Sequence, residues 1–113
     1  MSTAPKPQEA VQDPVKVDPK HYKVEIENEQ VRVLRINYGA HEKSVMHSHP
    51  NGVAIFQNDI HCRFTFPDGK SQDFNGKVGD VIYDDAKVHL PENTGDKAFD
   101  VVLVELKGKP SAK

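Results

Sequence analysis

The sequence has no tryptophan and a single cysteine, Cys62, among its 113 residues. One cysteine cannot form an intramolecular disulfide, which excludes the disulfide frameworks that stabilise many small secreted domains. No apolar run approaches the roughly 20 residues that a membrane-spanning helix needs. Residues 1–12 also lack the apolar stretch that is typical of a signal peptide. These features lead us to expect a cytoplasmic protein that makes no contact with a membrane.

An excess of charge of one sign is also missing. The chain contains 15 Lys and Arg residues against 17 Asp and Glu residues, which gives a formal net charge of −2. A surface that binds nucleic acid usually carries a clear excess of Lys and Arg, so nucleic acid is not an expected partner. The length suits one compact domain.

The N-terminal end has the composition of a tail. Over residues 1–19, prolines are mixed with polar residues and alanine, and apolar residues follow no period. Such a segment buries too little apolar surface to become ordered by itself. We therefore expect a flexible tail over residues 1–19, one folded domain over residues 20–107 and a short polar tail over residues 108–113.

Short strands are indicated through the folded part. Apolar and polar residues alternate over residues 24–36 and 60–66, and residues 79–83 and 99–106 are further apolar stretches of strand length. Residues 67–70, Pro-Asp-Gly-Lys, have the composition of a hairpin turn. No window of about a dozen residues keeps a helical period. The pattern predicts an all-β fold, either a small antiparallel barrel or a sandwich.

Three histidines form the candidate site. His47 and His49 are two positions apart, and residues i and i+2 of a strand point to the same face. His89 lies 40 residues after His49 and can approach from a second strand. Neutral imidazole is a common ligand of Zn, Fe, Cu and Ni. The pattern therefore predicts a site for a divalent metal ion on His47, His49 and His89, with Fe, Zn, Mn and Ni as candidates.

The order of these features resembles the cupin superfamily. Gly39 precedes His47-Ser48-His49 as in the first cupin motif, and Gly79 precedes His89 and Asn93 as in the second. The resemblance covers roughly residues 20–107. It implies a small antiparallel jelly-roll barrel, a metal ion in its interior held by the three histidines, and a small molecule as ligand or substrate. Because cupins are commonly dimers, we also expect a homodimer.

The sequence departs from the cupin motifs at several positions. Many cupins place a glutamate ligand four or five residues after the second histidine, where this chain has Val53 and Ala54. Asn58-Asp59 replace the glycine that closes the first motif, and Asp85 and Lys87 stand where proline and glycine are common. The loss of the glutamate leaves a three-histidine variant in which the ion keeps its +2 charge. We expect Val53 to occupy the place of the glutamate and to face the metal.

Three functions are compatible with this pattern. Three-histidine cupins that resemble it include non-haem Fe(II) dioxygenases of thiols and β-dicarbonyls, which implies a dioxygenase-like enzyme on a small anionic or chelating substrate. The alternative is a non-enzymatic ligand-binding or sensor barrel, with or without metal. A purely structural barrel would bind no metal at all.

The remaining candidate residues give weaker signals. We expect His21, His41 and His61 to lie on the surface, and Cys62 to be a buried, inert thiol among aromatic residues. Tyr83, Asp84 and Asp85 precede His89 and are candidates for the mouth of a pocket. Asn93 shares the face of His89 only if the strand continues past Pro91.

Overall fold

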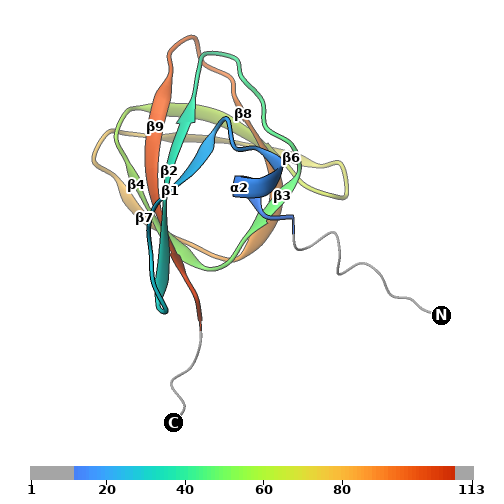
Figure 1. The fold of residues 1–113 in the computed structure, drawn as a ribbon. Coiled ribbons are helices and arrows are strands. Elements are labelled where there is room, and N and C mark those ends of the chain that lie inside the picture. The colour runs from blue at the N-terminus through green and yellow to red at the C-terminus, as the bar shows by residue number, and fades with distance from the viewer. Residues whose placement is uncertain (1–11, 109–113) are drawn as a thin grey trace, which may run out of the picture.

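The computed structural model describes residues 12–108, which form two antiparallel sheets around a common interior (Figure 1). The strand order is β1-β2-β9-β4-β7 in the five-stranded sheet and β3-β8-β5-β6 in the four-stranded sheet. The strands are β1 (Tyr22–Glu27), β2 (Val31–Tyr38), β3 (His47–His49), β4 (Gly52–Phe56), β5 (Ile60–Thr65), β6 (Ser71–Gly76), β7 (Val81–Asp84), β8 (Lys87–Asn93) and β9 (Phe99–Leu106). The expected all-β jelly-roll fold is thus confirmed.

The core lies between the two sheets and follows the alternation of the strands. Along β9, Phe99, Val101, Leu103 and Glu105 are buried, and the residues between them are half-buried. Leu34 of β2 is completely buried. Burying a leucine side chain of this kind stabilises the fold by about 1.5–3 kcal/mol, so a few such positions set which face of each strand points inward.

The turn predicted over residues 67–70 connects β5 to β6. The Phe66 amide donates to the Lys70 carbonyl, and the Gly69 amide donates to the Phe66 carbonyl. Gly69 has a φ of 88°, a backbone conformation that side chains with a Cβ rarely adopt. The hairpin that joins β5 and β6 therefore depends on glycine at this position.

The flexible tail expected over residues 1–19 stays a prediction for residues 1–11, which lie outside the described residues, whereas the last part of that segment contains a short helix. Helix α2 (Pro14–Val17) begins after Asp13, whose carboxylate accepts a hydrogen bond from the Val15 amide. Arg32 of β2 donates to both Asp13 oxygens at 3.0–3.1 Å, and Pro14 is buried. The ion pair with Arg32 stabilises this segment, whose own composition would not order it.

Within residues 12–108, the structure has no helix with the length and hydrophobicity of a membrane span.

We predict that Asp13→Ala lowers the free energy of unfolding by about 1–3 kcal/mol, because it removes a helix N-cap and the charged hydrogen bonds to Arg32. Urea denaturation followed by circular dichroism measures this change. Lys16→Ala, at an exposed position of the same helix, is the control and should change stability by less than about 0.5 kcal/mol. Equal stability of the Asp13 variant and wild type would show that the segment does not pack on the barrel in solution.

Candidate metal centre and ligand cavity

The structure brings together the three histidines that the sequence singles out. Strands β3 and β8 are antiparallel neighbours, and His47 pairs directly with His89 across them. His49 lies two residues farther along β3 and points to the same side. One ring nitrogen from each histidine can be chosen so that all three lie within 4.8 Å of one another. The local reason is the register of β3 against β8, which places all three imidazoles on the interior face.

The three imidazoles are buried, and several of their nitrogens have no protein partner. His47, His49 and His89 are 0, 6 and 5% exposed. Among the described residues, nothing forms a hydrogen bond with Nε2 of His47 or with either ring nitrogen of His89. A buried polar atom without a partner costs about 1–3 kcal/mol. A neutral imidazole has one nitrogen lone pair, and a divalent metal ion would accept one from His47 and one from His89. The donor set therefore fits a metal site.

The protein fixes the orientation of two of the three rings. Nδ1 of His47 donates to the Val45 carbonyl at 2.8 Å, which leaves its Nε2 lone pair free to point inward. Nδ1 of His49 donates to the Glu105 carboxylate at 2.8 Å in the same way. The ring of His89 instead stacks on Phe64, with 4.9 Å between the centroids. Hydrogen bonds of this kind select the tautomer and the direction of a ligating histidine.

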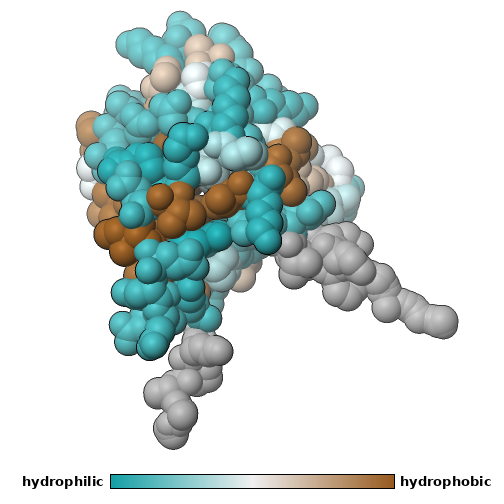
Figure 2. All heavy atoms as spheres, in the orientation of Figure 1, coloured by the Kyte–Doolittle hydropathy of each residue, from teal (hydrophilic) through white to brown (hydrophobic). Residues whose placement is uncertain are grey.

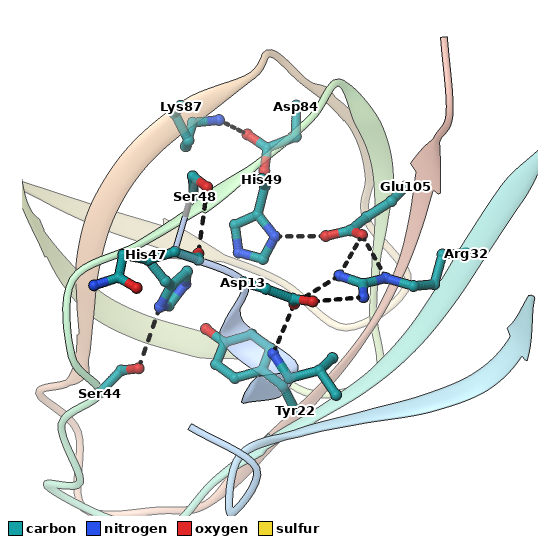
Figure 3. A network of polar contacts seen from close by, with 12 residues as sticks. Asp13, Tyr22, Arg32, Ser44, His47, Ser48, His49, Asp84, Lys87 and Glu105 are labelled. Atoms are coloured by element: carbon teal, nitrogen blue, oxygen red, sulfur yellow. Dashed lines mark hydrogen bonds and ion pairs between the residues drawn. The ribbon is translucent and has the colours of Figure 1, made fainter. Parts of the chain in front are cut away.

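Glu105 belongs to a chain of charged groups that leads to the N-terminal segment (Figure 3). Its carboxylate lies 2.9 Å from the Arg32 guanidinium, which also pairs with Asp13. The hydrogen bond from Arg32 holds the pKa of Asp13 below its usual value. Sequence reasoning missed Glu105, although a glutamate inside the apolar stretch 101–106 was a detectable signal. The candidate centre thus has a carboxylate beside one of its histidines, in contact with Nδ1.

The electrostatic surroundings keep His47 and His89 neutral. Burial, reinforced by the neighbouring His49, lowers the pKa of His47 to about 4. Burial also lowers the pKa of His89 to about 2, with further contributions from His49 and His47. Both imidazoles are therefore neutral at pH 7, which is the form that binds a metal ion.

A cavity of about 150 Å³ adjoins the histidine cluster. Its walls are mainly aromatic and aliphatic, and His49 and His89 form part of them. Among the described residues, those that line the cavity include no lysine or arginine, and the charged one, Asp84, forms an ion pair with Lys87. The arrangement suits a small apolar group with one polar end at the histidines.

Solved structures of other proteins show the same architecture. A cupin domain from Bordetella pertussis Tohama I aligns with a TM-score of 0.71 and 22% identity, over 77% of this chain and 92% of that chain. The fold is that of the cupins. An RmlC-like cupin family protein from Methanocaldococcus jannaschii aligns with a TM-score of 0.58 and 20% identity, over 79% and 83% of the two chains. A protein with a double-stranded β-helix domain from Klebsiella pneumoniae aligns with a TM-score of 0.58 and 18% identity, over 96% and 93%.

No family model and no curated protein matches the sequence. The structural likenesses, all at 22% identity or less, therefore establish the cupin fold, and the chemistry must be argued from the site itself.

Val53 does not face the cupin interior, so that expectation is wrong. Along β4, Gly52, Ala54 and Phe56 are buried while Val53 is half-buried on the opposite face. Ala54 lines the cavity beside the histidines, whereas Val53 does not. Residues 50–51 separate β3 from β4. The alternation of inward-facing and outward-facing residues therefore cannot be counted from His49 through that turn. Of the two residues at the place where many cupins have the glutamate, Ala54 is the one that faces the interior.

The surface position expected for His21 is also wrong. His21 is 4% exposed and stacks on Tyr38, with 4.2 Å between the ring centroids. Its Nδ1 lies 2.7 Å from the Asp18 carboxylate, and its Nε2 lies 2.9 Å from Glu42. These partners come from two separate segments, and they satisfy a histidine that local sequence alone would place in water.

Several weaker expectations agree with the structure. His41 and His61 are exposed. Burial raises the pKa of the Cys62 thiol to about 12, which makes the thiol inert.

Strand β8 continues through Pro91 to Asn93, as the shared face with His89 requires. The buried Asn93 side-chain amide donates to the carbonyls of Gly39 and Lys97, so its role is structural. Of Tyr83, Asp84 and Asp85, only Asp84 is among the residues that line the cavity.

The buried neutral histidines predict a dependence of stability on pH. Because the pKa values of His47 and His89 in the folded protein lie below the ordinary histidine value of 6.5, the unfolded chain binds more protons than the folded protein between pH 6.5 and 4. The free energy of unfolding of the metal-free protein should therefore fall as the pH falls through this window, with up to about 1.4 kcal/mol per pH unit from each histidine.

Urea unfolding of chelator-treated protein at several pH values between 6.5 and 4.5 measures this slope. His89→Leu should make it shallower by up to about 1.4 kcal/mol per pH unit, while the contribution of the carboxylates stays the same. An unchanged slope in the variant would mean that His89 is not held neutral by the folded protein.

Proposed function

We propose that this protein holds one divalent metal ion on His47, His49 and His89 in the interior of its cupin fold. The observation that supports this most strongly is the set of buried ring nitrogens without a protein partner, Nε2 of His47 and both nitrogens of His89. Burial of two imidazoles with nitrogens that lack a partner is costly unless a ligand compensates. The three rings stand nearly perpendicular to one another, at 88–89°, so their nitrogens approach the space between them from different directions.

Each part of the site has a distinct role in this proposal. The bound ion would supply a Lewis-acidic centre with open positions for a chelating ligand. Glu105 and the Val45 carbonyl hold His49 and His47 in the orientation that directs Nε2 inward. Phe64 supports the ring of His89 from its face. The apolar walls exclude water from the space beside the histidines.

The cavity indicates the class of ligand. A cavity of similar volume in another protein binds benzene, so the ligand has on the order of six to eight non-hydrogen atoms. A charged tail would lose its hydration in these apolar walls without gaining a cationic partner. We therefore propose a small neutral molecule with one chelating end directed at the histidines. Of the two classes expected from sequence, anionic or chelating, the cavity favours the chelating one.

The candidate activity is dioxygenase-like chemistry on such a chelating molecule, for example a small β-dicarbonyl. The second candidate is a non-enzymatic barrel that binds or senses the same class of ligand. One observation favours it: the carboxylates nearest the site, Glu105 and Asp84, are already paired with Arg32 and Lys87. Neither is free to act as a general base in the arrangement described.

We predict that the protein binds about one divalent ion per chain. His47→Ala, His49→Ala and His89→Ala should each weaken binding at least about 10-fold, because each removes one direct ligand. Metal titration followed by calorimetry, with elemental analysis of untagged protein, gives affinity and stoichiometry. His41→Ala and His61→Ala, at exposed positions, are the controls. Unchanged affinity in the His47 and His49 variants would remove the basis of the proposed site.

We further predict that Ala54→Phe abolishes ligand binding, because Ala54 lines the cavity and a phenyl ring fills it. The measurements are the affinity of the metal-loaded protein for 2,4-pentanedione and substrate-dependent O₂ uptake by the iron-loaded protein. Ala40→Phe makes the same change at an exposed loop position and should leave both unchanged. Ligand binding without O₂ uptake would favour the non-enzymatic candidate, and equal binding by both variants would show that the ligand lies elsewhere.

A further inference from the structure

The N-terminal strap, by which we mean residues 12–18 with helix α2, lies beside the strand that carries two of the three candidate ligands. Strand β3 is at the edge of its sheet and has β8 as its neighbour on one side. In an antiparallel ladder, every second residue directs its amide away from the paired strand. The amide of Ser48, between His47 and His49, donates to the Gln12 carbonyl at 2.8 Å. The strap is therefore the second neighbour of this strand, as α2 beside β3 in Figure 1 illustrates.

The first carboxylate of the strap, Asp13, is linked to His49 through two residues (Figure 3). Nδ1 of His49 donates to Glu105 at 2.8 Å, and Nε of Arg32 donates to the same carboxylate at 3.0 Å. The other nitrogens of Arg32 donate to both oxygens of Asp13 at 3.0 and 3.1 Å. Asp13 therefore fixes the position from which Arg32 contacts Glu105. Two carboxylates and one guanidinium give this chain of groups a formal net charge of −1.

The second carboxylate, Asp18, is linked to His47 through one residue. The Ser44 hydroxyl donates to Asp18 at 2.5 Å, and its oxygen lies 3.4 Å from Nδ1 of His47. Ser44 and Asp18 are only 8 and 9% exposed, so water competes little for this contact. Nδ1 of His47 also donates to the Val45 carbonyl. The two acceptors lie on the same side of the ring and leave Nε2 for the interior.

We propose that the strap sets the affinity of the three-histidine centre for its metal ion, with Asp13 and Asp18 as positioning residues. This inference rests on the metal site of the proposed function. Acidic groups behind a ligating histidine fix its ring and raise its basicity, and here both chains of hydrogen bonds end on the strap. The two carboxylates also bring negative charge towards a centre whose imidazole ligands supply none.

The coupling between strap and metal works in both directions. Helix α2 has four residues, far fewer than a helix needs to be stable alone in water, so its position depends on contacts with the barrel. Lys16 and Val17 are exposed. Figure 2 shows both hydrophilic and hydrophobic residues on the surface where Figure 1 places α2. An ion that holds His47 and His49 should stabilise the docked strap by the same factor by which the strap improves binding of the ion.

Calorimetric titration of the full chain with Zn(II) tests the proposal. Asp13→Asn retains a good N-cap residue but loses the charge that pairs with Arg32. Ser44→Ala removes the link between Asp18 and His47. Each variant should weaken Zn(II) binding about 3- to 10-fold, which is less than the roughly 10- to 100-fold loss for a group in full contact with a ligand.

Asp73→Asn is the matched control. It makes the same chemical change in an ion pair of exposed residues, Arg63 and Asp73, on β5 and β6. Because this pair has no contact with the strap or the histidines, Zn(II) affinity should change by less than about 2-fold. An equal loss of affinity in the control would overturn the proposal, since the effect would then not be specific to the strap.

Two further measurements separate positioning from a purely structural role. In a Glu105→Gln background, Asp13→Asn should have almost no further effect on Zn(II) affinity, because the charged link to His49 is already lost. Hydrogen exchange of the Val17 amide, which donates to the Asp13 carbonyl, reports on the strap itself. Zn(II) should slow this exchange in the wild type and slow it less in Asp13→Asn. A structural residue would give additive affinities and the same exchange with and without the ion.

The outcomes distinguish this inference from the proposed function. A wild type that binds one Zn(II) per chain, with equal affinity in both strap variants, would overturn the role of the strap and leave the metal site intact. A wild type that binds no Zn(II) would overturn both. Circular dichroism verifies the fold of each variant, and Ser44→Ala decides the matter if Asp13→Asn does not fold.

Discussion

The burial of three imidazoles with their ring nitrogens close together is the constraint on which the rest of this structure depends. The direct pairing of His47 with His89 across β3 and β8 creates the cluster, and His49 joins it from the same face. Such a cluster is unfavourable in an apolar interior unless the nitrogens find partners. Glu105 and the Val45 carbonyl satisfy only the outward-facing nitrogens of two rings. The remaining lone pairs are what make a metal ion the best account of the site.

The sequence predicts those features that depend on local periodicity. Alternation gives the strands, and the spacing of His47 and His49 gives their common face. Periodicity fails where a turn interrupts it: residues 50–51 break the count between His49 and β4, so that Ala54 rather than Val53 faces the interior. It also fails where stability comes from distant residues. Arg32 orders the segment at Asp13, and Glu42 with Asp18 satisfies the buried His21.

The five-stranded sheet contributes to the candidate site through its inner face. On the inner face of β4 and β9, Ala54 and Leu103 line the cavity. Glu105, also on β9, accepts a hydrogen bond from His49. On the outer face of the same strands, Val53 pairs with Val104. The residues of both faces are therefore apolar, and the two strands read as nearly continuous apolar runs. A change on the outer face, for example at Val53, need not disturb the histidines on the other side.

Anomalous X-ray diffraction from crystals grown with Fe(II) or Zn(II) tests the central claim most directly. The account predicts one strong peak per chain inside the barrel, at about 2.0–2.2 Å from one ring nitrogen each of His47, His49 and His89. It also predicts that Glu105 stays hydrogen-bonded to Nδ1 of His49 and does not contact the ion. A peak elsewhere, or none in crystals whose histidines are ordered, would contradict the three-histidine centre.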